Sequence, residues 1–228
     1  MPKNMQDIKT RAYVLRRTNY AEADRILNLI TPEGKISAIA KGVRKSKSKL
    51  AGGVELFSLT EVCVHMGRGE MGILTSAKML KYYDKLVADF ERMELAAMVL
   101  RKISMAAESS DAPEYFAMTD AALSCLNDGT DTKLVESWFL LNLSKVLGEE
   151  VNVYRDANGE KLAAECCYDF DAMEGAFLKR EHGEFGANEI KLLRLMLTAD
   201  LNVVRRVKNM ETMLPQILRL ARVVSKMM

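Results

Sequence analysis

Side chains suited to catalysis are few in this sequence. Its 2 histidines are His65 and His182, and neither belongs to a nucleophile-elbow or HExxH pattern. Gly67, Gly69 and Gly72 match the GxGxxG spacing of dinucleotide-binding loops, but a Rossmann unit continues with a helix and a second strand that ends in an acid. A short strand follows here instead, so the glycines predict a hairpin turn. We expect a protein that is not an enzyme.

The cysteines offer little to a metal ion. A structural zinc site needs four ligands in tight pairs, whereas Cys166 and Cys167 are adjacent and have only His182 nearby. Side chains of neighbouring residues in an extended chain also point apart. We therefore expect reduced structural cysteines, no metal and no cofactor.

A run of cations between residues 41 and 49 carries the strongest chemical signal. Lys41, Arg44, Lys45, Lys47 and Lys49 stand in a segment without an acid, and small residues separate them. Such a flexible segment can follow a phosphate backbone, where counterion release dominates sequence-independent binding. The run predicts a contact with nucleic acid.

Other residues could extend this surface. The cations that could do so in the same region are Arg11, Arg16, Arg17, Arg25 and Lys35. Aromatic rings can stack on bases, and the candidates are Tyr13, Tyr20 and Phe57. The last predicted helix has Arg219, Arg222 and Lys226 on one face, which could add a second phosphate contact.

Charge is unevenly distributed along the chain. Residues 1–80 carry a net charge of +7, residues 81–185 of −10 and residues 186–228 of +5, which the overall +2 conceals. A basic end beside an acidic middle is typical of nucleic-acid-binding modules, although a solvated surface can show it too.

Nothing in the sequence points to a membrane. Charges occupy residues 1–14, where a secretory signal needs an apolar run, and no stretch reaches the roughly 18 apolar residues of a membrane helix. Few, irregularly spaced cysteines favour a reducing compartment. We expect a cytoplasmic protein with no membrane contact.

The first 80 residues read as short strands separated by turns. β-branched and aromatic residues with turn signals predict strands at 11–18, 24–31, 35–42, 56–66 and about 71–76. Five strands are too few for a sandwich, so we expect a small antiparallel barrel, of which the OB-fold is the commonest type.

Helical periodicity begins at about residue 77. It predicts helices over 85–107, 113–127, 132–147, 188–199 and 211–227, with 132–147 apolar nearly all round and therefore central. An irregular insertion at about 150–186 contains the hairpin signal Asn158-Gly159. The prediction is an α+β protein with an OB-fold domain over 1–80 and a helical bundle domain over 81–228.

Two segments of the predicted barrel carry a specific pattern. They are Asn19–Leu27 (NYAEADRIL) and Thr31–Lys45 (TPEGKISAIAKGVRK), and they are followed by Gly67–Glu70 (GRGE) and Ile73–Ala77 (ILTSA). Over residues 10–80 the chain thus resembles the bacterial DNA repair protein RecO family. Beyond them the similarity is architectural, because that family also has an OB-fold followed by a helical domain.

The resemblance implies a recombination mediator without catalytic turnover. Such proteins bind single-stranded DNA, anneal complementary strands, act with RecR and help RecA displace single-stranded DNA-binding protein. They also dock the acidic, apolar tail of that protein on the helical domain, and Arg101, Lys102 and Lys133 are candidate contacts here. Many members have a four-cysteine zinc motif in the insertion, which this chain does not match.

Two other functions fit the same residues. The first is a protein-interaction adaptor whose barrel contacts an acidic partner and whose helices form the main docking surface. The second is RNA binding, since stacking and phosphate contacts do not distinguish the two sugars.

Overall fold

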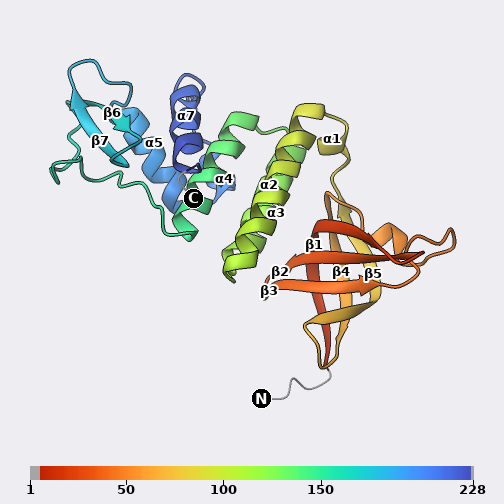
Figure 1. The fold of residues 1–228 in the computed structure, drawn as a ribbon. Coiled ribbons are helices and arrows are strands. Elements are labelled where there is room, and N and C mark those ends of the chain that lie inside the picture. Colours follow the sequence, from red (N-terminus) through yellow and green to blue (C-terminus); the bar gives the residue numbers. More distant parts are fainter. Residues whose placement is uncertain (1–5, 227–228) are drawn as a thin grey trace. The chain divides into compact units, whose positions relative to one another are not determined.

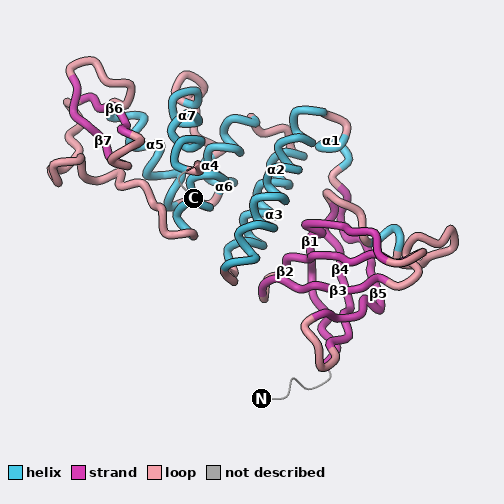
Figure 2. Tube along the Cα trace, in the orientation of Figure 1, coloured by secondary structure: helices cyan, strands magenta, loops and turns pink. Residues whose placement is uncertain are grey.

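The computed structural model describes residues 6–226. The chain forms two compact units, Met1–Gly129 and Thr130–Met228. The first contains a closed five-stranded barrel and a helical hairpin, and the second contains the remaining helices and a two-stranded sheet (Figures 1 and 2). The predicted α+β class with an N-terminal barrel is confirmed.

The barrel has the strand order β1-β2-β3-β5-β4, and β4 closes against β1. Only β3 and β5 pair in parallel. The strands are β1 (Gln6–Tyr20), β2 (Asp24–Thr31), β3 (Gly34–Ala40), β4 (Ser58–Met66) and β5 (Met71–Tyr82). All five predicted strands are present. However, β5 runs to Tyr82, so the expected change to helical periodicity at about residue 77 is wrong.

A β-bulge in β1 decides which side chains enter the barrel. The register with β2 shifts between Val14 and Arg16. Before the shift Ala12 and Val14 belong to the barrel core, and after it Arg17 and Asn19 continue the inward face. The extra residue therefore places Arg17 and Asn19 on the inward face at the end of the barrel.

The barrel core is made of small and branched apolar side chains. Besides Ala12 and Val14 it contains Leu27, Leu29, Ala38, Ala40, Val62, Val64 and Leu74. Gly72 lies where a Cβ would come within 2.3 Å of Val64 Cγ1. The Gly67–Gly72 pattern therefore belongs to the β4–β5 hairpin, as predicted, and Gly72 allows close packing inside the barrel.

Helices α1 (Asp84–Val87), α2 (Phe90–Ser109) and α3 (Glu114–Asn127) follow the barrel. The α2–α3 hairpin packs on β1, and α3 also contacts β2. Tyr13 extends from β1 into this contact, with its ring centroid 5.5 Å from that of Phe116 in α3. The outward face of the bulged strand thus holds the hairpin.

A buried hydrogen-bond network joins the barrel to the hairpin. The Tyr13 hydroxyl donates to Asp120 Oδ1 at 2.5 Å and lies 2.7 Å from the Tyr83 hydroxyl, which is 3.1 Å from Ser124 Oγ. Burial is the largest cause that raises the pKa of both tyrosines above their ordinary value. Both rings are fully buried, so the polar groups must satisfy one another.

The second unit is arranged around α4 (Thr132–Val146), which packs on α5 (Ala187–Thr198) and α7 (Leu214–Val224). A short helix α6 (Leu201–Val204) joins the last two. Trp138 is buried and its indole N–H donates to the Ala199 carbonyl at 3.0 Å. The prediction that α4 is buried is confirmed.

The insertion is more regular than its sequence suggests. Asn158-Gly159 forms a turn between the bridged residues Arg155 and Lys161, as predicted. A second hairpin, β6 (Cys167–Asp171) and β7 (Ala176–Arg180), was not predicted. The hairpin buries Tyr168 and Phe177, and two strands of five residues are too short to show an alternating apolar pattern in the sequence.

The boundary between the two compact units differs from the predicted domain boundary at residue 80. By internal contacts α1, α2 and α3 belong with the barrel, whereas the sequence division places them with the helices. The functional division at residue 80 stays a prediction.

Replacing Tyr13 with Phe should destabilise the protein. The change leaves Asp120 and the Tyr83 hydroxyl without their shared partner, which should cost about 2 kcal/mol of unfolding free energy. Urea unfolding followed by circular dichroism measures it. Tyr20→Phe is the control, because this exposed side chain should change stability by less than about 0.5 kcal/mol. Equal losses in both variants would show that the network is unimportant.

High pH should weaken the fold through the same two tyrosines. Their pKa values are raised in the folded state, so the unfolded chain releases these protons first as pH rises. Their stabilising contribution is complete below pH 10 and declines above it. Unfolding free energies at increasing pH test this, together with the ultraviolet absorbance of tyrosinate. A decline above pH 10 as steep in Tyr13→Phe as in the wild type would contradict it.

Candidate nucleic-acid interface

The cationic segment forms a loop that starts where β3 ends. Its first turn is fixed to the β1–β2 turn, because Arg44 N–H donates to the Ala23 carbonyl at 2.9 Å and Gly42 N–H to Asp24 Oδ1 at 2.7 Å. Gly42 has a φ of 64°, and the next residue, Val43, is buried in the barrel core. The loop is therefore anchored at its base, which positions the cations beyond it.

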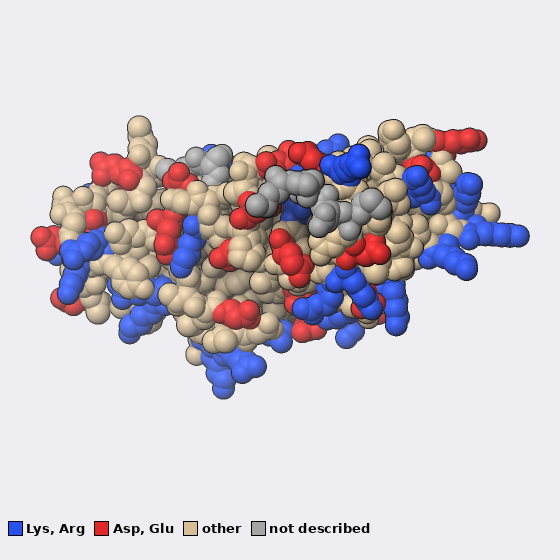
Figure 3. All heavy atoms as spheres, turned by 90° about the horizontal axis from the view of Figure 1, so that it is seen from below, with Lys and Arg blue, Asp and Glu red and all other residues tan. Residues whose placement is uncertain are grey.

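All five predicted loop cations are exposed, namely Lys41, Arg44, Lys45, Lys47 and Lys49. Within residues 6–226 none of them lies within 4.0 Å of a carboxylate oxygen. Arg44 donates to the Glu22 carbonyl at 3.3 Å. In Figure 3 lysine and arginine side chains project at the right-hand edge, where Figure 1 shows the loop after β3.

Cations in other parts of the described chain are neutralised more often. On the last helix Arg222 makes a two-pronged contact with Glu136, at 2.6 and 2.8 Å, and this contact raises the pKa of Arg222. Arg219 pairs with Glu184 at 2.8 Å. The basic face of α7 thus has carboxylate partners, unlike the loop.

Two further predicted residues lie at the loop's end of the barrel. Tyr20 is the last residue of β1 and 51% exposed. Arg25 lies between Asn19 of β1 and Ala40 of β3, directly before the loop, and its Nε donates to Asn19 Oδ1 at 3.2 Å. The structure brings Tyr20, Arg25 and the loop together.

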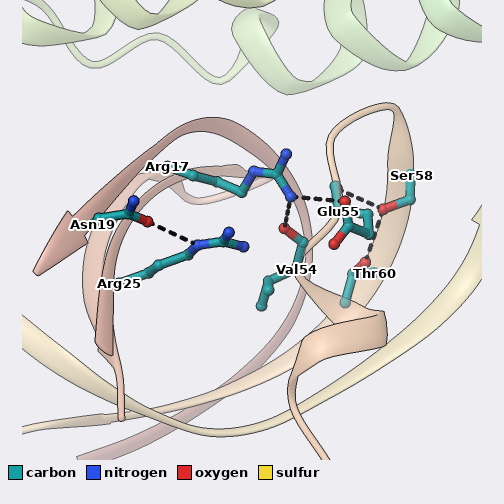
Figure 4. Close-up of polar contacts among 7 residues, drawn as sticks. All are labelled: Arg17, Asn19, Arg25, Val54, Glu55, Ser58 and Thr60. Carbon is teal, nitrogen blue, oxygen red and sulfur yellow. Dashed lines mark hydrogen bonds and ion pairs between the residues drawn. The ribbon is translucent and has the colours of Figure 1, made fainter. Parts of the chain in front are cut away.

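Polar side chains line this end of the barrel, which we call the barrel mouth: Arg17, Asn19, Arg25, Ser58 and Thr60 (Figure 4). Arg17 Nη1 lies 2.7 Å from Glu55 Oε2 and 3.5 Å from the Val54 carbonyl. The role of Glu55 has no sequence signal, because nothing in the pattern reveals the bulge that turns Arg17 inward.

Arg11 and Lys35 lie elsewhere. The Arg11 guanidinium stacks 5.7 Å from the centroid of the Phe116 ring, and Lys35 Nζ lies 3.8 Å from Glu108 Oε1 with 19% of its side chain exposed. Both face the helical hairpin, and Lys35 is at the opposite end of β3 from the loop. Their contact with nucleic acid stays a prediction.

The other aromatic candidates differ from Tyr20. Tyr13 is 1% exposed, so the idea that its ring stacks on bases is wrong: the ring packs against the helices. Phe57 is half-buried at a φ of 56°, where the chain turns into β4. Its availability for stacking stays untested.

The three candidate partner contacts are divided between the two compact units. Arg101 and Lys102 are neighbours on α2, whereas Lys133 is in the first turn of α4, in the other compact unit. Burial, and then the adjacent Arg101, lower the pKa of Lys102. The structure therefore groups two of the three.

The second unit has a cavity of about 390 Å³ that the sequence does not reveal. It lies between the β6–β7 region and α7, with Phe170, Phe185 and Leu220 among its apolar lining and Arg219 at its polar side. Because its walls come from distant segments, no local motif marks it.

Residues 6–226 contain neither a metal-binding cluster nor a membrane-spanning helix. No group of three or more His, Cys, Asp or Glu side chains is arranged to hold a metal ion there. No helix in that range has the length and apolar character to cross a membrane.

Two family models match nearly the whole chain. Recombination protein O N terminal covers residues 5–83, and Recombination protein O C terminal covers residues 88–223. The chain belongs to the RecO family. This confirms the resemblance carried by Asn19–Lys45, and it makes the protein a DNA repair protein.

Relatives of this RecO chain are about 30% identical to it over the aligned residues. A DNA repair protein RecO of Dehalococcoides mccartyi (strain 195) is 30% identical over 211 residues, which are 89% of this chain and 83% of that protein. The one from Roseiflexus sp. (strain RS-1) is 29% identical over 171 residues, 75% of this chain and 60% of the relative. A third, from Desulfitobacterium hafniense (strain Y51), is 32% identical over 139 residues, 60% and 50% of the two chains.

Proposed function

We propose that this RecO protein binds single-stranded DNA through the 41–49 loop and anneals complementary strands. The observation that carries the proposal is the set of five exposed loop cations without a carboxylate within 4.0 Å in residues 6–226. Exposed ammonium and guanidinium groups release counterions when phosphates replace them. Arg25 and Tyr20 adjoin the loop, so phosphate and base contacts can form at one end of the barrel.

Annealing follows from the same electrostatics. Two strands repel each other through their phosphates, and a cationic surface that binds both reduces this repulsion. The reaction needs no catalytic group. Acting in the cytoplasm with RecR, the protein would help RecA load onto DNA coated with single-stranded DNA-binding protein.

Neutralising the loop should weaken DNA binding broadly. A variant with Gln at Arg44, Lys45, Lys47 and Lys49 should lose on the order of a hundredfold in affinity at about 0.15 M salt, and its log–log salt slope should fall by about 3, since each lost single-strand phosphate contact removes about 0.7. Fluorescence anisotropy of a labelled oligothymidylate at several salt concentrations measures both quantities.

The matched control removes four exposed cations from the second unit, with Gln at Lys161, Lys191, Arg206 and Lys208. It should keep most of the affinity. Equal losses in the two variants would remove the loop as the principal contact. A parallel titration with RNA, and the absence of any DNA binding by the wild type, distinguish the RNA-binding and adaptor alternatives.

We further propose that the helical part docks the acidic, apolar tail of single-stranded DNA-binding protein. The candidates are Arg101 and Lys102 on α2 and Lys133 on α4. A specific observation supports a second position: Arg219 stands beside the apolar lining of the 390 Å³ cavity, although Glu184 pairs with it. A cation next to apolar side chains suits such a tail, whereas the carboxylates of Asp169 and Glu184 in the same lining oppose it.

Peptide binding should identify the docking position. The affinity for a labelled tail peptide should fall about tenfold when the protein's cation that contacts the peptide is replaced, since a charge-assisted contact contributes about 1.5 kcal/mol or more. The variants are Arg101→Ala with Lys102→Ala, Lys133→Ala, and Arg219→Ala. The 41–49 loop variant is the control for non-specific charge. Unchanged binding in all three would place the tail elsewhere.

A further inference from the structure

The barrel mouth holds more positive charge than its neighbours neutralise. Arg17 and Arg25 both extend across it, and the carboxylate that reaches them is that of Glu55, on Arg17 (Figure 4). Arg25 donates its side-chain hydrogen bond to the uncharged Asn19 Oδ1. Two guanidinium groups therefore face one carboxylate.

The strand register places these arginines within reach of one ligand. Arg25 lies opposite Asn19, and Arg17 is two residues before Asn19 on the same face of β1. Such diagonal neighbours are about 7–8 Å apart, a separation that long side chains span easily. A single tetrahedral anion can accept from both guanidinium groups.

Glu55 has a distinctive position. It is the only acid between Lys41 and Phe57, and it stands on the limb of the loop that returns to the barrel. Its side chain is 45% exposed and that of Arg17 is 25% exposed, so solvent reaches the pair. An exposed ion pair of this kind is weak and can exchange partners.

We propose that the barrel mouth is a phosphate site of the DNA-binding surface, and that Glu55 pairs with Arg17 until single-stranded DNA binds. On binding, a backbone phosphate takes over Arg17 and bridges it to Arg25, while Glu55 turns to solvent. The exchange makes Glu55 an affinity-limiting residue. This inference rests on the proposed binding of single-stranded DNA by the adjoining loop.

Two features of the molecule favour phosphate as the ligand. Guanidinium groups bind both carboxylates and phosphates through two parallel N–H···O contacts, but a phosphate has more oxygens and can accept from two arginines at once. Arg25 also pairs with Ala40 of β3, the residue directly before the cationic loop. A strand lying on the loop would therefore continue into the mouth without a break in positive charge.

The test compares two acids that carry the same charge at the same end of the barrel. Glu55→Gln frees Arg17 and should tighten oligothymidylate binding by about two- to fivefold. Glu22→Gln removes an exposed carboxylate from the β1–β2 turn, where the Arg44 side chain donates to the Glu22 backbone carbonyl. It should have a smaller effect, because within residues 6–226 no cation lies within 4.0 Å of this carboxylate. Anisotropy of the labelled oligothymidylate measures both.

A double-mutant cycle with Arg17 then separates exchange from general charge. Arg17→Gln should lower the salt slope by about 0.7, as expected for one phosphate on a single strand. In this background Glu55→Gln should gain no more than Glu22→Gln. Thermal unfolding by circular dichroism verifies that each variant is folded, and the Glu55–Glu22 comparison stands even without an Arg17 variant.

Three outcomes decide the matter. Tighter binding confined to Glu55→Gln and dependent on Arg17 supports the exchange. Equal gains from the two glutamates, or weaker binding by Glu55→Gln, would overturn the inference and leave the loop's role intact. A wild-type protein that does not bind the oligonucleotide would overturn the proposed function and this inference with it.

Discussion

The extra residue in β1 is the constraint on which the first compact unit depends. By shifting the register between Val14 and Arg16 it lets one strand serve two environments. Before the bulge Tyr13 faces outward and reaches the helical hairpin, and after it Arg17 and Asn19 face the barrel end. Without the shift, strict alternation after Val14 would place Arg16 and Thr18 inward, and Arg17 and Asn19 would face away from the mouth.

The cations of this protein differ in whether a carboxylate lies beside them, and this difference matters more than the net charge. The α7 arginines, Lys35 and Arg17 all contact carboxylates, so these four cations are already neutralised. The 41–49 loop differs because turns and small residues carry its side chains away from the folded surface. A net charge of +2 is therefore compatible with a strongly cationic end of the barrel.

Much of the fold was predictable because its signals are local. Alternation and turn residues predict all five barrel strands, and the nearly all-round apolar surface of α4 predicts that it is buried. The β6–β7 hairpin was missed because its two strands are only five residues long. The loop was found as a run of charge, but the partners of Lys35 and Arg17 come from distant segments, and composition carries no information about such pairings.

The contact between Tyr13 and the hairpin also bears on how the chain can be divided. The first family match ends at residue 83, within the network that Tyr83 makes with Tyr13, Asp120 and Ser124. A protein fragment that ends there would expose the Tyr13 ring to water. It would also lack Asp120, whose carboxylate accepts the hydrogen bond from the Tyr13 hydroxyl. The segment matched by the first family model is thus shorter than the compact unit, which extends to Gly129.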